Sequence, residues 1–335
     1  MDQLSTINTT QISVYQRFLA GKRSPLTRAA YRYDLKRFAQ FLEIETFDHI
    51  PDGGWAKLDP AMVSAYIEWL ATYTSAHTGR RYSTATIARQ VTAVRELLTE
   101  AMYCGLYPAD RLAYIKDRIT KALPTVTHNH HSSISNDDLT AILKAAYDQP
   151  GLRGSRDYLI FRLLVETGLR RAELAGLSIR DIERHQGVSG LVVRGKGDRL
   201  RFVGIEDDTH ALILSWLDEA GQVGPELPIF CRLRKRGRGE EARFSVVDRA
   251  KRLHPRSINT ILTAVLGQAG VLSRVTPHSF RVAFVTQALD GDAPILAVQQ
   301  ATGHTTTRMI TEVYDRNTYT APVSRFIKGV YKPEK

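Results

Sequence analysis

The strongest constraint on the fold is a helix start signal that recurs three times in the first third of the chain. Ser24 precedes Pro25 and Asp59 precedes Pro60, so that a capping side chain is followed by proline at the first helical position. Ser83 is a third capping residue, followed by Thr84 in place of proline, and opens another helical segment. Apolar residues then recur at helical spacing, as in Tyr31, Leu35, Phe38 and Leu42, and in Ile87, Val91, Val94 and Leu98. The pattern predicts a small helical bundle over residues 11–123.

Length and composition indicate a two-domain globular protein. With 335 residues, of which 43% are hydrophobic and 24% charged, each domain is able to bury a core of its own. The beginning MDQLSTINTT lacks a signal-peptide pattern, and no apolar run approaches the roughly 18 residues of a membrane span. Cys104 and Cys231 are too few for a disulfide framework or a cysteine-ligated zinc site. We therefore expect a cytoplasmic protein without a membrane partner.

The net charge of +11 points to a polyanionic partner, because lysine and arginine that neutralise phosphates release condensed counterions. Residues 1–125 and the remainder of the chain are both net basic, so both parts are expected to touch that partner. In the helical domain the candidate DNA contacts are Arg28, Arg32, Lys36, Arg80, Arg81 and Arg89. A solvated basic surface that only maintains solubility is the competing interpretation.

The rest of the chain divides into a linker, a second domain and a tail. Residues 1–10 are an N-terminal tail, 124–134 a polar linker, 135–320 a second domain and 321–335 a C-terminal tail. Ser135 caps the first helix of the second domain, with Asp138 placed as in a capping box. LVVRGKGDRLRFVGI predicts a β-hairpin, and helices are expected near 208–220, 257–268, 281–289 and 295–301. The predicted fold class is mainly α with a small β-hairpin or sheet.

Between two of these elements lies RLRKRGRGEEARF, residues 232–244, which we interpret as a basic exposed loop. Beside DNA, its residues Arg234, Lys235 and Arg236 would contact the backbone.

Six residues stand out as candidates for chemistry because of their type and local context. They are Arg170 in TGLRRAEL, Lys196 in RGKGDR, His278 and Arg281 in PHSFR, His304 in ATGH and Tyr314 in MITEVYDR. Each has an ordinary structural explanation when it is taken singly. In this order and in these contexts they resemble the catalytic domain of the tyrosine recombinase (phage integrase) family, and SPLTRAAYRYDLKRFAQFL resembles its helical core-binding domain. The resemblance covers nearly the whole chain.

The resemblance implies a role for each matching residue. Arg170 takes the place of the first catalytic arginine, with Glu173 supporting it, while the neighbouring Arg171 is not a candidate. Lys196 matches the lysine of the GKG hairpin and Tyr314 the nucleophile. His278 and Arg281 match the HxxR box and His304 the histidine of the LGH motif. Three departures are Thr302 in place of the LGH leucine, Val282 and Ala283 after the HxxR box, and a ten-residue gap from His304 to Tyr314.

The chemistry implied by the resemblance is site-specific DNA recombination without ATP, metal or another cofactor. Two guanidinium forks suit a phosphate whose charge grows toward the transition state, and the lysine suits protonation of the leaving 5′ oxygen. Tyr314 would form a 3′-phosphotyrosine, because a phenol with a pKa near 10 becomes a useful nucleophile only in a cationic pocket. The implied partners are double-stranded DNA with specific sites and further copies of the chain. We expect a monomer or dimer off DNA, a homotetramer on paired sites and association with the nucleoid.

Two alternatives share this fold: a type IB topoisomerase-like relaxing enzyme, and a non-catalytic DNA-binding regulator. A metal-dependent nuclease or transposase fits less well, because no carboxylate cluster with metal spacing stands out. In the tail, Val323, Phe326, Ile327 and Val330 recur at helical spacing. This apolar stripe either folds back on its own domain or docks on a neighbouring subunit.

Overall fold

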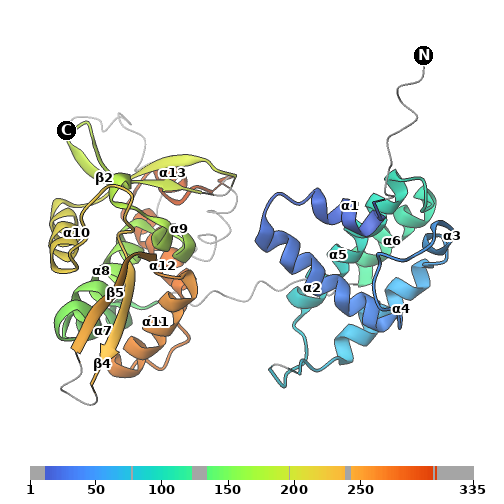
Figure 1. Cartoon of the computed structure of the whole chain (residues 1–335), viewed down its shortest axis with the longest axis horizontal. Coiled ribbons are helices and arrows are strands. Elements are labelled where there is room, and N and C mark those ends of the chain that lie inside the picture. Colours follow the sequence, from blue (N-terminus) through green and yellow to red (C-terminus); the bar gives the residue numbers. More distant parts are fainter. Residues whose placement is uncertain are drawn as a thin grey trace, which may run out of the picture. The chain divides into compact units, whose positions relative to one another are not determined.

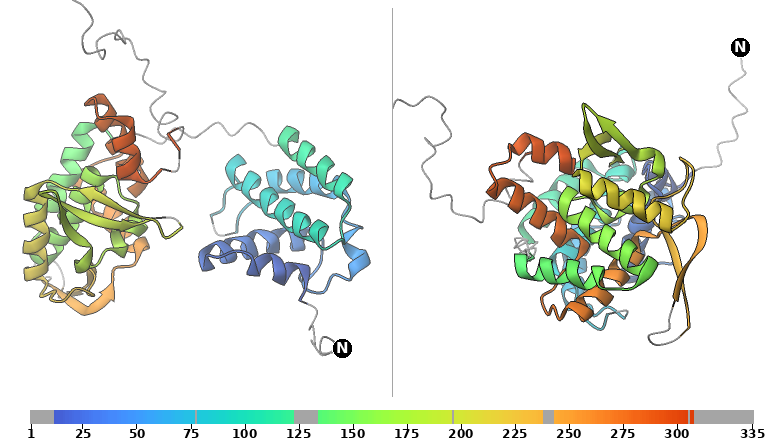
Figure 2. Two further views of the ribbon diagram at one scale, coloured as in Figure 1. Left: turned by 90° about the horizontal axis from the view of Figure 1, so that it is seen from above. Right: turned by 90° about the vertical axis from the view of Figure 1, so that its left-hand side faces the viewer.

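A computed structural model describes residues 12–76, 78–122, 134–195, 197–237, 243–304 and 306–307. The chain divides into two compact units, residues 1–129 and 130–335 (Figure 1). In the described part of the first unit all regular elements are helices, whereas the second unit combines helices with two small antiparallel sheets (Figure 2). This confirms the predicted fold class. Nearly all of the predicted linker lies outside the described residues.

The first unit consists of short helices whose starts follow the capping signals in the sequence. Side chains of Ser24, Asp59 and Ser83 each accept a hydrogen bond from a backbone N–H in the first turn of their helix. The elements are α1 (Val14–Ala20), α2 (Pro25–Phe41), α3 (Asp52–Trp55), α4 (Pro60–Thr72), α5 (Thr84–Tyr103) and α6 (Ala109–Ala122). Local sequence therefore places the starts of α2, α4 and α5.

The core of the first unit lies between α2, α4 and α5. Fully buried side chains from these helices include Leu35, Phe38, Tyr66, Leu70, Val91, Val94, Leu97 and Leu98. One ion pair also joins α2 to α5, in which the buried Asp34 accepts from the half-exposed guanidinium of Arg89. Burial raises the pKa of the Asp34 carboxyl, although Arg89 opposes that rise. The two helices that carry Arg28, Arg32, Lys36 and Arg89, four of the six DNA contacts predicted in the first unit, are thus fixed to each other.

The second unit is organised around α8, which packs against α7, α10 and α12 (Figure 1). Its helices are α7 (Asn136–Tyr147), α8 (Gly151–Thr167), α9 (Arg171–Gly176), α10 (Asp207–Glu219), α11 (Pro255–Ala269), α12 (Pro277–Asp290) and α13 (Ile295–Thr302), with a 3₁₀ turn η1 (Ile179–Asp181). Its strands are β1 (Ile182–His185), β2 (Val188–Arg194), β3 (Leu200–Gly204), β4 (Cys231–Arg236) and β5 (Arg243–Arg252).

The predicted GKG hairpin is present and is part of a larger sheet. Strands β1, β2 and β3 form an antiparallel sheet in that order, and β1 was not predicted. In its register, Leu191 pairs with Val203 and Val193 pairs with Arg201. Leu191, Val193 and Val203 are buried, so Arg201 lies on the face of the sheet that covers the core.

The prediction of a basic loop over residues 232–244 is wrong, because the segment forms the hairpin β4–β5. Leu233 pairs with Val246, and both side chains are half-buried against the core of the second unit. The guanidinium of Arg153 lies 5.4 Å from the ring centre of Phe244. Apolar contacts that alternate with the basic residues therefore stabilise strands in a segment that looks uniformly polar.

Two details of helix capping also differ from the sequence prediction. Helix α12 begins at Pro277, four residues before the expected start, because Thr276 and Ser279 form a capping box there. Ser135 does cap α7 by accepting from the N–H of Asp138, but the Asp138 carboxylate accepts from Ser273 Oγ at 2.8 Å. The early start of α12 matters for the site, because it puts His278 and Arg281 on one helical turn.

Candidate active site

Arg170 is positioned by the sharp end of helix α8. Gly168 ends that helix with a φ of 59°, and a Cβ there would lie 2.5 Å from the ring of Phe284. The chain then turns into α9, with Arg170 at its N-terminus. Glu173 accepts from the backbone N–H and from Nη1 of Arg170, each at 2.9 Å. The arginine side chain, still 41% exposed, is held at its base and open toward a ligand.

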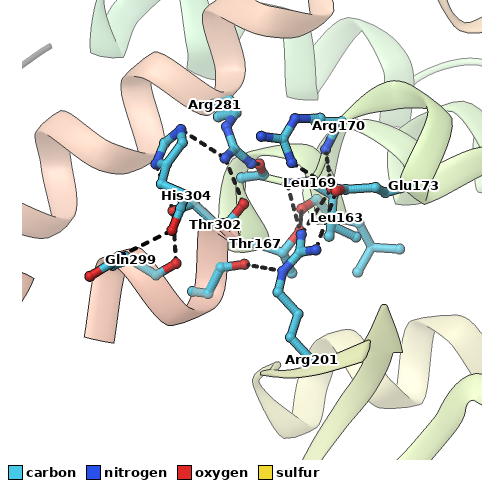
Figure 3. Close-up of polar contacts among 12 residues, drawn as sticks. Leu163, Thr167, Leu169, Arg170, Glu173, Arg201, Arg281, Gln299, Thr302 and His304 are labelled. Carbon is cyan, nitrogen blue, oxygen red and sulfur yellow. Dashed lines mark hydrogen bonds and ion pairs between the residues drawn. The ribbon is translucent and has the colours of Figure 1, made fainter. Parts of the chain in front are cut away.

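Glu173 is the centre of this arrangement and holds a second arginine as well. Arg201 Nη1 and Nη2 donate to the two carboxylate oxygens of Glu173 at 3.2 and 2.9 Å (Figure 3). Burial raises the pKa of the Glu173 carboxyl, but hydrogen bonds from Arg201 and Arg170 outweigh that effect and leave the pKa below its ordinary value. An ionised Glu173 therefore accepts hydrogen bonds from both Arg170 and Arg201.

Arg201 is the residue that the sequence analysis missed. Its Nε donates to the carbonyl oxygen of Ala301 at 2.8 Å, so that it joins strand β3 to the end of α13. The sequence contained a signal for this position, because Arg201 and the apolar Val203 are two residues apart and so lie on the same face of strand β3. An arginine on the covered face of a strand requires a carboxylate partner, and Glu173 supplies it.

Arg281 is buried, with 3% of its surface exposed, on the first turns of α12. Its Nη1 donates to the carbonyl oxygen of Gly168 at 2.8 Å and its Nη2 to that of Thr302 at 2.6 Å. Burial and the neighbouring Arg170 and Arg201 lower the pKa of Arg281 to about 9, although Glu173 opposes the shift. The guanidinium thus remains mainly cationic at neutral pH. It ties the end of α8 to the end of α13.

His304 follows the end of α13 and lies next to Arg281. Arg281 Nη2 lies 2.9 Å from His304 Nε2, and Thr302 Oγ1 lies 2.9 Å from His304 Nδ1 (Figure 3). Burial, followed by the charges of Arg281 and Arg170, lowers the pKa of His304 to about 4. The ring is therefore neutral at physiological pH.

A cavity of about 290 Å³ opens in front of these groups. Arg170, His278 and Arg281 all line it, together with Leu169, Arg171, Asn259, Thr276 and Pro277. His278 is exposed on the first turn of α12, and Arg171 Nη1 donates to Asn259 Oδ1 at 2.7 Å on the rim. The structure thus brings Arg170, His278 and Arg281 to one concave surface, with Glu173 and His304 behind them.

Two predicted catalytic residues, Lys196 and Tyr314, lie outside the described residues. The neighbour of Lys196 does have a defined place, because a Cβ on Gly195 would lie 3.8 Å from Glu173 Oε1 and 3.2 Å from Arg201 Nη1. The turn of the β2–β3 hairpin therefore begins beside Arg201, which belongs with Arg170 and Arg281 to the arginine cluster of the site.

Among the predicted DNA contacts, Arg32, Lys36, Arg80, Arg81, Arg89, Arg234 and Lys235 are exposed, and the side chain of Arg236 lies outside the described part. Arg28 is half-buried and donates to the carbonyl oxygen of Lys22 at 3.2 Å. Arg89 forms an ion pair with Asp34, so that Arg28 and Arg89 each have a contact within the protein.

In the described ranges, no three His, Cys, Asp or Glu side chains are grouped so that they could hold a metal ion. Across the same ranges, no helix combines the length and apolar character of a membrane span.

A helical unit followed by a mixed domain, with Arg170, His278 and Arg281 on one cavity, is the arrangement expected of a tyrosine recombinase. Comparison with known proteins shows that the chain belongs to this class of DNA-recombining enzymes. A model described as "Phage integrase family" matches residues 132–321, and one described as "Phage integrase, N-terminal SAM-like domain" matches residues 12–104. The chain belongs to the phage integrase family.

Relatives of known name agree with this assignment. The chain is 29% identical over 323 residues to tyrosine recombinase XerC of Pelobacter propionicus, covering 91% of this chain and 94% of the relative. It is 30% identical over 306 residues to tyrosine recombinase XerC of Mycobacterium sp. (strain JLS), covering 88% and 90%. A lambda integrase fragment solved as a dimer bound to a COC′ core site shares the fold, with a TM-score of 0.64 at 16% identity over 92% of this chain and 96% of that one.

Proposed function

We propose that this recombinase cleaves and rejoins DNA strands at specific sites through a 3′-phosphotyrosine on Tyr314, without ATP or a metal ion. The observation that carries the proposal is the convergence of Arg170 and Arg281 on one cavity. The two guanidinium groups come from different helices, and Glu173, Gly168 and Thr302 hold them from behind. A cavity with two fixed cations is suited to a phosphodiester.

The arginines act on the charge of the reacting phosphate. When the tyrosine oxygen attacks, negative charge grows on the nonbridging oxygens, and donors already fixed in place stabilise it without reorganisation. Burial is the main cause of the lowered pKa values of Arg281 and His304, and repulsion from neighbouring cations lowers them further. A bound phosphate relieves that repulsion, so the site favours an anion.

Proton transfer falls to three groups in this proposal. His278 lines the cavity and His304 lies against Arg281, so both are near the phosphate and the phenol that must lose its proton. Lys196, which follows Gly195 beside the arginine cluster, protonates the leaving 5′ oxygen. The 5′ hydroxyl of a second strand then attacks the phosphotyrosine bond and releases Tyr314.

The partners proposed are double-stranded DNA with specific recombination sites and further copies of this chain. The net charge of +11 and the exposed arginines and lysines of α2 and α5 support contacts with the DNA backbone. We propose that the protein binds single sites as a monomer or dimer and pairs two sites as a homotetramer. Such an enzyme is expected to associate with the nucleoid in the cytoplasm.

The test is covalent trapping on DNA from the region that flanks the gene. Duplexes nicked beside candidate sites lose a short fragment after cleavage, so that the phosphotyrosine intermediate cannot be resealed. We expect an adduct that resists denaturation, forms in EDTA and is absent in Tyr314→Phe, which removes the attacking oxygen alone. An adduct that persists in Tyr314→Phe, or a requirement for magnesium, would contradict the proposal. Relaxation of plasmids without paired sites would favour a topoisomerase-like activity.

A further inference from the structure

The hydroxyl of Thr302 lies between the His304 ring and the last turn of helix α13. Thr302 is fully buried and lies beside His304 (Figure 3), with 2.9 Å between Thr302 Oγ1 and His304 Nδ1. The same oxygen lies 2.6 Å from the carbonyl oxygen of Val298. A second carbonyl oxygen, that of Gln299, lies 3.3 Å away. The position is occupied by leucine in the LGH motif that this segment resembles, and leucine has no hydrogen-bonding group. The contact is therefore particular to a chain with threonine here.

The hydrogen-bonding partners assign the protons in this group. A guanidinium only donates, so the 2.9 Å contact from Arg281 Nη2 requires a lone pair on His304 Nε2. A neutral ring then carries its proton on Nδ1, which donates to the hydroxyl oxygen of Thr302. The hydroxyl proton of Thr302 is directed to the carbonyl oxygen of Val298. Every donor in this series has an acceptor, and reversing the ring tautomer would place two donors against each other at Arg281.

The arrangement leaves one ring nitrogen available for proton exchange. Thr302 Oγ1 accepts from Nδ1–H equally well in the neutral and the charged ring, so Nδ1 keeps its proton in both states. The proton that His304 gains or loses is therefore the one on Nε2, and a ring that takes up this proton gives up the hydrogen bond from Arg281 Nη2. Among the described residues, the charged and titratable groups that act on the ring are Arg281 and His278 on α12, Arg170 at the start of α9, and Arg201 on β3. Glu173 pairs with Arg170 and Arg201.

We propose that Thr302 is a positioning residue that holds His304 as the Nδ1–H tautomer and so makes Nε2 the nitrogen that exchanges protons at the phosphate. The catalytic part of this statement rests on the proposed recombinase function. The tautomer itself is a property of the free protein. The two parts are therefore open to separate measurement.

The experiment compares Thr302→Val, Thr302→Ser and the unaltered full-length chain. Valine keeps the shape but has neither donor nor acceptor, whereas serine keeps the hydroxyl. Nitrogen NMR of protein labelled at histidine reports the protonated ring nitrogen, with His304→Gln identifying the signal. Single-turnover cleavage of the nicked site and DNA affinity are measured on the same samples.

We expect Thr302→Val to lose the uniform Nδ1–H signal of His304. Its cleavage should be slower by roughly tenfold to a hundredfold, the scale seen when the outer partner of a metal-bound histidine is removed. DNA affinity should stay within about twofold, because His304 contributes to the reacting phosphate and not to most backbone contacts. Thr302→Ser should restore both the tautomer and the rate.

An unchanged tautomer or an unchanged rate in Thr302→Val would overturn the proposal. So would a Thr302→Ser variant as slow as Thr302→Val, because loss of methyl packing would then explain the effect. If the unaltered protein formed no covalent adduct, the recombinase mechanism would fail, while the NMR comparison on free protein would still decide the tautomer.

Discussion

Arg201 and Glu173 form a two-point ion pair, with nitrogen–oxygen distances of 3.2 and 2.9 Å, which fastens strand β3 to the start of helix α9. The same carboxylate holds Arg170, and the same guanidinium holds the carbonyl oxygen of Ala301. Arg201 thereby joins the β2–β3 hairpin, Arg170 and the end of helix α13, which precedes His304. None of these three segments is adjacent to another in the sequence.

This relationship predicts the result of replacing Arg201. Arg201→Met leaves the buried Glu173 with one arginine, which should cost about 1–3 kcal/mol of the free energy of unfolding. Cleavage should fall by more than DNA binding, because Arg170 loses its support. Urea denaturation and single-turnover cleavage measure the two effects. Arg199→Met, on the exposed turn of the same hairpin, is the matched control and should change neither by much. Equal effects of the two substitutions would exclude the role given to Arg201.

Stability should depend on pH through His304. Its pKa is about 4 in the folded protein, against 6.5 for an unperturbed histidine, so the unfolded chain binds the proton more readily between these values. The contribution is present in full above pH 6.5 and is lost as the pH falls toward 4. We expect about 1–2 kcal/mol after allowance for solvent screening of a half-buried ring. Denaturation of the unaltered chain and of His304→Gln at about pH 7 and about pH 5, on either side of the unperturbed histidine pKa, isolates the contribution of His304 to the free energy of unfolding. The same pH dependence in both proteins would contradict the prediction.

The two adjacent arginines of TGLRRAEL should differ sharply in their effect on catalysis. Arg170 lines the cavity next to Arg281 and is held by Glu173, whereas Arg171 pairs with Asn259 on the rim. Arg170→Ala should slow cleavage by about 10²–10³-fold, the usual loss when one donor to a transition-state charge is removed. Arg171→Ala, a change of the same kind one residue away, should cost far less. Single-turnover rates at saturating DNA decide this, and similar losses would reassign the catalytic arginine.

DNA binding by the first unit should show as a change in salt dependence. Arg32 and Lys36 are exposed on α2, one helical turn apart. If each neutralises one phosphate, the double alanine variant should lower the slope of log affinity against log salt by about two. Affinity titrations from low to moderate salt give the slope. Lys57→Ala, an exposed lysine outside α2 and α5, should leave it unchanged, and an unchanged slope in the double variant would place the DNA elsewhere.

The C-terminal tail, whose residues lie outside the described part, should couple cleavage to assembly. A chain that ends at Thr320 lacks the apolar stripe of residues 323–330 but keeps Tyr314. If the stripe docks on a neighbouring subunit, this chain should bind a single site normally and lose cooperative pairing of sites together with most recombination. Gel-shift assays on one-site and two-site DNA measure binding and the pairing of sites, and a two-site recombination assay measures the recombined product. Undiminished recombination would indicate that the tail folds back on its own domain or has no role in assembly.

The sequence by itself determined the starts of α2, α4 and α5, the fold class and the order of the candidate catalytic residues. Ser24, Asp59 and Ser83 cap helices as expected, because capping and helical periodicity depend on residues within a few positions of one another. The support of Arg170 by Glu173 is of the same local kind, since the two lie three residues apart on one helical turn.

Only the tertiary structure decided which distant groups support that site. Arg201 reaches Glu173 across 28 positions and Ala301 across 100, and Arg281 reaches Gly168 across 113. The strands β4 and β5 likewise depend on packing of Leu233 and Val246 against the core, which a run of arginines conceals. Such contacts depend on how the chain packs, because hydrogen-bonding groups removed from water must find partners wherever the fold brings them.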